Sequence, residues 1–233
     1  MNTPLQYSLA ALVIGLLFSP LTSGQETKAT PAPKKPDPSL HKVEDVAGLP
    51  RVLLIGDSIS MGYTIPVQKL LEGKANVHRI PTNGGPTING IAHLKEWLGD
   101  GKWDVIHFNW GLHDIRYMPD NTRQVSPEDY EKNLRSLVAT LKATGAKLIW
   151  CSTTPVSEGT TGPVRKDEDV LAYNAIAKKV MDENGIQIDD LYAFALPQLS
   201  AIQLPKNVHY NGDGYSKLAE QVARTITPDL PAK

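Results

Sequence analysis

Arg51-Val-Leu-Leu-Ile-Gly-Asp-Ser-Ile-Ser60 is the stretch that decides the fold. Its run of branched apolar residues, from Val52 to Ile55, is typical of a short strand buried on both faces, as in a parallel sheet. The chain must then turn at Gly56, and a polar residue at the carboxyl end of a central parallel strand lies in the crevice where open α/β sheets bind ligands. If a helix begins just after Ser58, backbone N–H groups there favour developing negative charge. The stretch therefore predicts either a serine nucleophile or a simple helix cap at Ser58.

Beyond this stretch, strand patterns alternate with helix patterns. Strands are expected over residues 76–80, 103–109, 147–152 and 185–189, and helices over 65–71, 88–98, 169–183 and 213–226. Another helix is expected between Ser126, with Pro127 after it, and Gly145, because serine followed by proline favours a helix start and glycine favours an end. The alternation is typical of βα units with right-handed crossovers. The sequence therefore predicts an α/β fold, a three-layer α/β/α sandwich around a mainly parallel five-stranded sheet.

The composition narrows the class of protein. The chain has 233 residues, 41% of them apolar, which suffices for one good core. A formal net charge of −1 gives no reason to expect attraction to nucleic acid or to an anionic membrane. The single cysteine, Cys151, excludes an intramolecular disulfide and a cysteine-based zinc site.

The first 24 residues have the pattern of a signal peptide. The run Leu9–Phe18 is apolar, uncharged and too short to span a bilayer, and the small residues Thr22, Ser23 and Gly24 follow it. The alternative is a buried core helix attached through a structureless linker. We expect residues 1–24 to be removed, so that the protein is exported to the periplasm or the medium without stable membrane insertion.

Residues 25–48 have the composition of a linker. The stretch Thr30–Pro38 is rich in proline and charge and offers too little apolar surface to fold. The compact domain is therefore expected to span residues 49–228.

Three further polar segments follow predicted strands or precede the last helix. They are Thr82-Asn-Gly-Gly-Pro-Thr87, Asn109-Trp-Gly-Leu-His-Asp114 and Lys206-Asn-Val-His-Tyr-Asn-Gly-Asp-Gly-Tyr215. Together with Gly56-Asp-Ser58, they are expected at one edge of the sheet. In this order and spacing the four segments resemble those of the SGNH (GDSL-type) hydrolases, serine esterases on a flavodoxin-like sandwich. The resemblance covers about residues 50 to 226.

The resemblance implies a role for one residue of each segment. Ser58 matches the nucleophile and His209 the catalytic base. Gly85, or alternatively Gly84, matches the glycine whose backbone N–H binds the oxyanion. His113 stands where the family has an asparagine that also binds the oxyanion; a neutral imidazole can still donate one N–H there.

A second departure from the family concerns the acid of the triad. That acid usually lies three residues before the histidine, where this chain has Lys206. An ammonium group cannot accept a hydrogen bond from an imidazole. Either Asn207, a backbone carbonyl or a more distant acid orients His209, or the enzyme works as a dyad.

The resemblance thus predicts an exported serine ester hydrolase. It implies cleavage of acetyl or other short-chain esters, including those of carbohydrates, with no metal and no organic cofactor. One alternative is a non-catalytic binding module on the same fold, because the two departures alter the oxyanion site and remove the acid. Another is a metal site built from His113, Asp114 and His209.

Several other residues allow more than one interpretation. Arg116, Tyr117 and Arg123 lie in a long loop that either contacts substrate or is simply solvated. Trp110 belongs either to a pocket wall or to the core. His107 and Cys151, inside predicted strands, are expected to be buried without a catalytic role.

Overall fold

The computed structural model describes residues 37–231. Its centre is an all-parallel sheet with the strand order β2-β1-β3-β4-β5. The strands are β1 (Arg51–Ile55), β2 (Asn76–Arg79), β3 (Val105–Phe108), β4 (Lys147–Cys151) and β5 (Gln187–Asp189). This is the flavodoxin-like order, whose direction changes between β1 and β3. The predicted fold class is confirmed.

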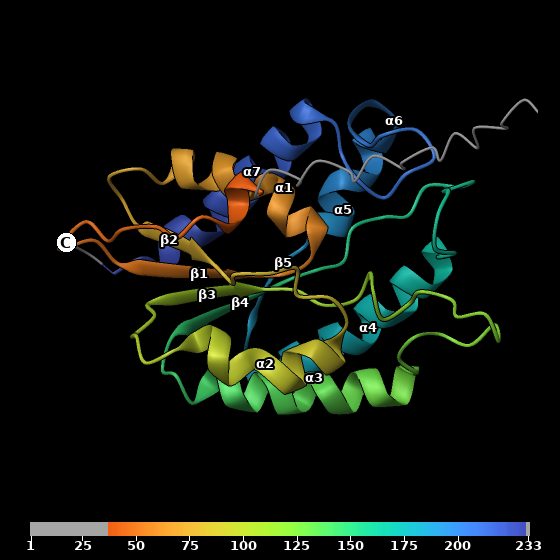
Figure 1. Ribbon diagram of the computed structural model, residues 1–233, viewed down its shortest axis with the longest axis horizontal. Coiled ribbons are helices and arrows are strands. Elements are labelled where there is room, and N and C mark those ends of the chain that lie inside the picture. The colour runs from red at the N-terminus through yellow and green to blue at the C-terminus, as the bar shows by residue number, and fades with distance from the viewer. Residues whose placement is uncertain (1–36, 232–233) are drawn as a thin grey trace, which may run out of the picture. The chain divides into compact units, whose positions relative to one another are not determined.

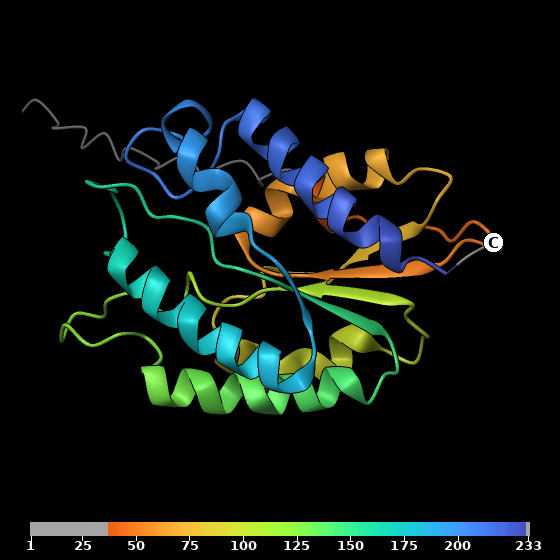
Figure 2. The ribbon, with the colours of Figure 1, turned by 180° about the vertical axis from the view of Figure 1, so that it is seen from behind.

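Helices cover both faces of this sheet. They are α1 (Ser58–Leu70), α2 (Thr87–Leu98), α3 (Pro127–Lys142), α4 (Asp167–Asn184), α5 (Leu191–Ala195), α6 (Leu199–Ile202) and α7 (Gly212–Ile226). Short 3-10 turns occur at η1 (Pro38–Leu40), η2 (Leu196–Gln198) and η3 (Thr227–Asp229). Figure 1 shows α1, α5 and α7 on one face and α2, α3 and α4 on the other, and the reverse view agrees (Figure 2). The sheet is thus the middle of three layers.

The register of β1 and β3 determines where the polar segments meet. Ile55 at the end of β1 pairs with Phe108 at the end of β3. Both residues are fully buried. The loops after these strands therefore start side by side at the carboxyl edge, where such sheets bind ligands.

The interior confirms the structural roles expected for two residues. His107 Nε2 lies 3.0 Å from an Asp189 carboxylate oxygen, and both side chains are fully buried. Cys151 is also buried, and burial raises the pKa of its thiol well above its ordinary value. Trp110 is buried too, which places it in the core rather than in a pocket wall. Residues 37–231 contain no helix long and apolar enough to cross a membrane.

The predicted domain boundary at residue 49 needs correction, because residues 37–48 contact the domain. The turn η1 packs against α1, and Ser39 is buried within it. Val46 exchanges hydrogen bonds of 2.9 and 3.0 Å with the side-chain amide of Asn76. Asp45 pairs with Arg51. The compact unit therefore begins no later than residue 37. The predicted signal peptide and the first part of the linker lie outside the described residues.

Candidate active site

Ser58 is the first residue of α1, and it is not the residue that caps the helix. The N-cap is Asp57, whose carboxylate accepts a hydrogen bond of 2.9 Å from the backbone N–H of Ile59. Since the cap is supplied by its neighbour, the Ser58 hydroxyl is free for another partner. Its Oγ lies 2.8 Å from Nε2 of His209, across a sequence separation of 151 residues. The structure thus brings together the two residues predicted as nucleophile and base.

Asn207 holds the other side of the His209 ring. Its Oδ1 lies 2.8 Å from His209 Nδ1 and accepts a second hydrogen bond, of 3.0 Å, from the His209 backbone N–H. Because a backbone N–H only donates, the Asn207 atom at this position must be the amide oxygen. Nδ1 therefore carries the ring proton, and Nε2 faces Ser58 with a free lone pair. Among the orienting groups considered from the sequence, Asn207 is the one in contact.

Lys206 is positioned by its backbone rather than by its side chain. It has a left-handed φ of 52°, and its carbonyl oxygen accepts hydrogen bonds from the backbone and hydroxyl of Thr161. The side chain is exposed and lines a surface depression with Glu158 and Leu204, apart from the pocket beside Ser58. The ammonium group therefore does not replace the family's acid as a partner of His209.

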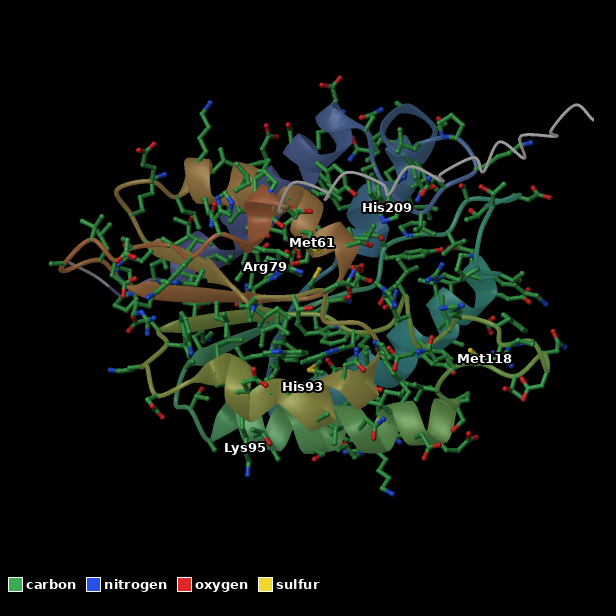
Figure 3. All side chains as sticks on the ribbon, viewed as in Figure 1. Met61, Arg79, His93, Lys95, Met118 and His209 are labelled. Carbon is green, nitrogen blue, oxygen red and sulfur yellow. The ribbon has the colours of Figure 1, made fainter. Side chains whose placement is uncertain are left out.

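Arg79, at the end of β2, stabilises the turn that carries Ser58. Its guanidinium donates to the carbonyl oxygens of Gly56 at 2.9 Å and Asp57 at 3.1 Å, and to the Ser60 hydroxyl at 2.7 Å. Burial lowers the pKa of Arg79 to about 10, so the group remains charged at neutral pH. Figure 3 shows Arg79 beneath α1, with His209 further toward the carboxyl ends of the strands. This role of Arg79 was not predicted from the sequence.

The glycine segment after β2 places both candidate oxyanion donors near the Ser58 turn. The N–H of Gly84 donates to the Gly56 carbonyl at 3.0 Å, which uses that donor within the backbone. The N–H of Gly85 donates to the Asn83 side chain at 3.0 Å. A side-chain partner can be replaced by a substrate oxygen more readily than a backbone partner, so Gly85 stays the predicted donor. Its φ of 59° requires glycine.

Asp114 links the third segment to the second. Its Oδ1 accepts hydrogen bonds of 2.9 and 2.6 Å from the backbone N–H and hydroxyl of Thr87. Its Oδ2 is buried with no hydrogen-bond partner in the described part of the chain. Burial raises the pKa of Asp114 to about 7, although the Thr87 hydrogen bonds favour the ionised form. Asp114 therefore supports the loops and directs its carboxylate to Thr87.

His113 lies half-buried on the same turn. Burial lowers its pKa from the ordinary value, and the charges of Arg165, Arg116 and His209 lower it further, whereas Asp57 opposes the shift. The ring is therefore neutral at neutral pH. In this form it can donate one N–H in a hydrogen bond. Because the charges of Asp57 and His209 change the pKa of His113, this histidine lies within electrostatic range of the Ser58 site.

A pocket of about 410 Å³ opens beside Ser58 and His209. The rest of its lining is Asp37, Pro38, Ser39, Met61, Gly62, Ile65 and Tyr215. At its wall the Tyr215 ring packs so closely on Gly62 that an added Cβ would lie 2.0 Å from it. This volume falls in the usual range for small-molecule sites. The place of residues 37–39 in the pocket lining was not predicted, because three polar or proline residues show no helix or strand periodicity.

The structure does not support the alternative of a metal site built from His113, Asp114 and His209. Within residues 37–231, the group of metal-ligating side chains that lie within 4.8 Å of one another is His107, Cys151 and Asp189, all buried in the core. Asp114 is instead bonded to Thr87, as described above.

Comparisons with known proteins identify a family for this chain. The model of the GDSL-like lipase/acylhydrolase family matches residues 54–217, more than half of the chain. An arylesterase of Vibrio mimicus is 28% identical over 110 residues, which cover 42% of this chain and 52% of that protein. The chain thus matches about half the length of this curated relative.

Solved structures share the fold. A lipase/acylhydrolase from Enterococcus faecalis superposes with a TM-score of 0.69 at 19% identity, covering 79% of this chain and 99% of that one. An acetylxylan esterase from Geobacillus stearothermophilus superposes with a TM-score of 0.63 at 21% identity, covering 76% and 94%. With the family match over residues 54–217, the chain belongs to the GDSL-like lipase/acylhydrolase family.

Proposed function

We propose that this protein is an exported serine esterase that hydrolyses acetyl or other short-chain esters, including those of carbohydrates. The observation that carries the proposal is the 2.8 Å contact between Ser58 Oγ and His209 Nε2. It lies at the start of a helix and at the change of strand direction, where the fold favours ligand binding and developing negative charge.

The reaction proceeds in two acyl-transfer steps. Ser58 Oγ attacks the ester carbonyl while its proton passes to His209 Nε2. The tetrahedral intermediate collapses, and the departing alcohol takes that proton, leaving the acyl group on Ser58. Water then attacks the acyl-enzyme and gives its proton to His209. Release of the carboxylic acid returns the proton to Ser58.

The oxyanion of each intermediate needs donors that are already in place. The backbone N–H groups of Ser58 and Gly85 and one ring N–H of His113 are the proposed donors. Binding of the substrate displaces the Asn83 side chain from the Gly85 N–H. Asn207 keeps His209 in the productive tautomer, and Arg79 holds the turn on which Ser58 sits.

Two observations support a short-chain ester as substrate. The pocket beside Ser58 is open and of modest volume, with polar residues at Asp37 and Ser39 as well as apolar ones. The fold neighbours include a protein described as an acetylxylan esterase. Export rests on the pattern of residues 1–24 alone.

Covalent labelling tests this function. A fluorophosphonate reacts with a serine only when a base activates the hydroxyl and the oxyanion site accepts the phosphonyl oxygen. We expect mass spectrometry of peptides to locate the label on Ser58, and we expect His209→Ala to prevent it. A wild-type protein that remains unlabelled would support the non-catalytic binding module instead.

A further inference from the structure

Two loops meet beside the Ser58 site, and each carries an arginine. Arg165 belongs to the loop between β4 and α4, and its Nε donates to the Leu112 carbonyl at 2.5 Å. Arg116 follows β3, and its backbone N–H donates to the His113 carbonyl at 3.2 Å. The loops are also joined by a 2.9 Å bond from the Tyr117 N–H to the Val164 carbonyl. The Arg165 side chain is thereby fixed to the turn that presents His113, and the backbone of Arg116 belongs to the same turn.

Neither arginine has an acidic partner within residues 37–231. In contrast, Arg51 pairs with Asp45, Arg123 with Asp169, and Arg135 with Glu131 and Glu183. Beyond its bond to Leu112, the Arg165 guanidinium contacts only the Pro163 carbonyl, at 3.4 Å. Most of the donors of these two side chains are therefore left for solvent or a ligand.

The position of Arg165 makes simple solvation a poor explanation for it. Its side chain is half-buried, and burial lowers the pKa of its guanidinium, against the effect of the Asp57 carboxylate. A charged group that loses part of its hydration without gaining a counter-ion is destabilised. An anionic ligand would remove that cost. Arg116 is exposed and adds a second positive charge next to it.

Both arginines lie near the reacting serine. Leu112, whose carbonyl holds Arg165, lines a small cavity together with Asp57, the residue before Ser58. The pocket beside Ser58 and His209 is lined by a different acid, Asp37, and by neither arginine. The 410 Å³ pocket therefore has an acid and neither arginine in its lining, whereas two arginines beside the His113 turn outnumber the single Asp57 carboxylate there.

We propose that Arg116 and Arg165 form an anion subsite, which selects esters whose molecule carries a carboxylate in addition to the scissile bond. Guanidinium groups bind carboxylates through two parallel hydrogen bonds. Acetyl esters of acidic sugars, in which one molecule holds both groups, are the class of substrate that fits best. This inference rests on the proposed esterase function and specifies its substrate.

Matched substrates and variants test the subsite. The neutral and anionic pair is methyl para-acetoxybenzoate and para-acetoxybenzoate, in which the carboxylate belongs to the alcohol part. A second pair, mono-para-nitrophenyl adipate and its methyl ester, places the carboxylate on the acyl part. We expect Arg165→Gln to lower kcat/KM about tenfold or more for the anionic member of at least one pair, as loss of a charge-assisted hydrogen bond requires. The neutral members should lose less, so that the ratio of anionic to neutral kcat/KM falls about tenfold.

The controls separate this inference from the proposed function. Arg224→Gln, on the exposed side of α7, should leave every ratio of anionic to neutral rates unchanged. Equal losses on anionic and neutral esters in Arg116→Gln and Arg165→Gln would overturn the subsite while leaving the esterase intact. If wild type turned over no ester, the esterase proposal would fail, and the anion subsite would be tested by ligand binding instead. Glucuronate, but not glucose, should then raise the Tm of wild type and not of Arg165→Gln; equal shifts would overturn it.

Discussion

Asn207 Oδ1 accepts hydrogen bonds from both the backbone N–H and the ring Nδ1 of His209, at 3.0 and 2.8 Å. In a serine triad a carboxylate occupies this position, where it fixes the tautomer and stabilises the imidazolium. An amide oxygen performs the first task without the second, because it carries no net charge. This contact therefore explains how His209 could act as the proposed base for Ser58 although a lysine stands at the usual acid position.

Asn207 should matter for rate. Asn207→Ala removes the acceptor that keeps the proton on Nδ1, and we expect kcat to fall about tenfold or more. Asn207→Asp keeps both hydrogen bonds and adds a negative charge, which favours the imidazolium, so the acidic limb of the kcat/KM profile should move to higher pH. Profiles for both variants provide the check. Wild-type kcat in Asn207→Ala would show that another group orients His209.

Lys206 serves as the matched comparison. Lys206→Asp would raise the acidic limb of the kcat/KM profile only if this side chain lay near His209. Because its side chain is exposed and lines another depression, we now expect the limb and the maximal rate to remain at their wild-type values. A clear shift in the profile of Lys206→Asp would place the lysine charge close to the imidazole.

The segment before β1 should affect both binding and stability. A linker that made no contact with the domain could be removed without effect on activity. The structure leads to the opposite expectation, because Pro38 and Ser39 line the pocket and Val46 satisfies the buried Asn76 amide. Removing residues 25–40 should raise KM more than it lowers kcat. Removing residues 25–46 should also lower the Tm by roughly 3–10 °C, as an unsatisfied buried amide costs about 1–3 kcal/mol. Unchanged values would show that these contacts contribute nothing.

Asp114 gives a prediction about pH. Its carboxyl has a pKa of about 7 in the folded protein, against about 3.9 when unfolded. The folded state therefore binds more protons between these values, so this group makes stability fall as pH rises from about 4 to about 7. Asp114→Asn lacks the titration, and its Tm should depend less on pH over that range. Parallel slopes for the two proteins would contradict the raised pKa.

The fold was predictable because its signals are repeated and local. The central strands β1, β3 and β4 consist mostly of apolar residues. The start of α3 shows the expected cap, with the Ser126 hydroxyl accepting from the Asp129 N–H at 3.1 Å. The start of α1 was placed too late, since a helix that begins with Ser-Ile-Ser lacks strong helix formers. Residues 37–48 were assigned to the linker because proline-rich composition says nothing about individual hydrogen bonds such as that between Val46 and Asn76.

The candidate site was predictable only in part. Ser58 and His209 were found because each belongs to a short recognisable segment. Arg79 was not, since a single arginine at the end of a strand is indistinguishable from a solvated one until its four acceptors are placed around it. Asn207 was one of several possible orienting groups, and only the distance between its oxygen and the ring could select it.

The most direct test of the central claim is the kcat/KM of Ser58→Ala with p-nitrophenyl acetate, measured beside its Tm. The serine hydroxyl is the proposed nucleophile and contributes little to packing at a half-buried position. We therefore expect activity to fall below about one per cent of wild type, because a triad nucleophile contributes several orders of magnitude, while the Tm stays nearly unchanged. Activity well above that level in a folded Ser58→Ala protein would mean that another residue attacks the ester.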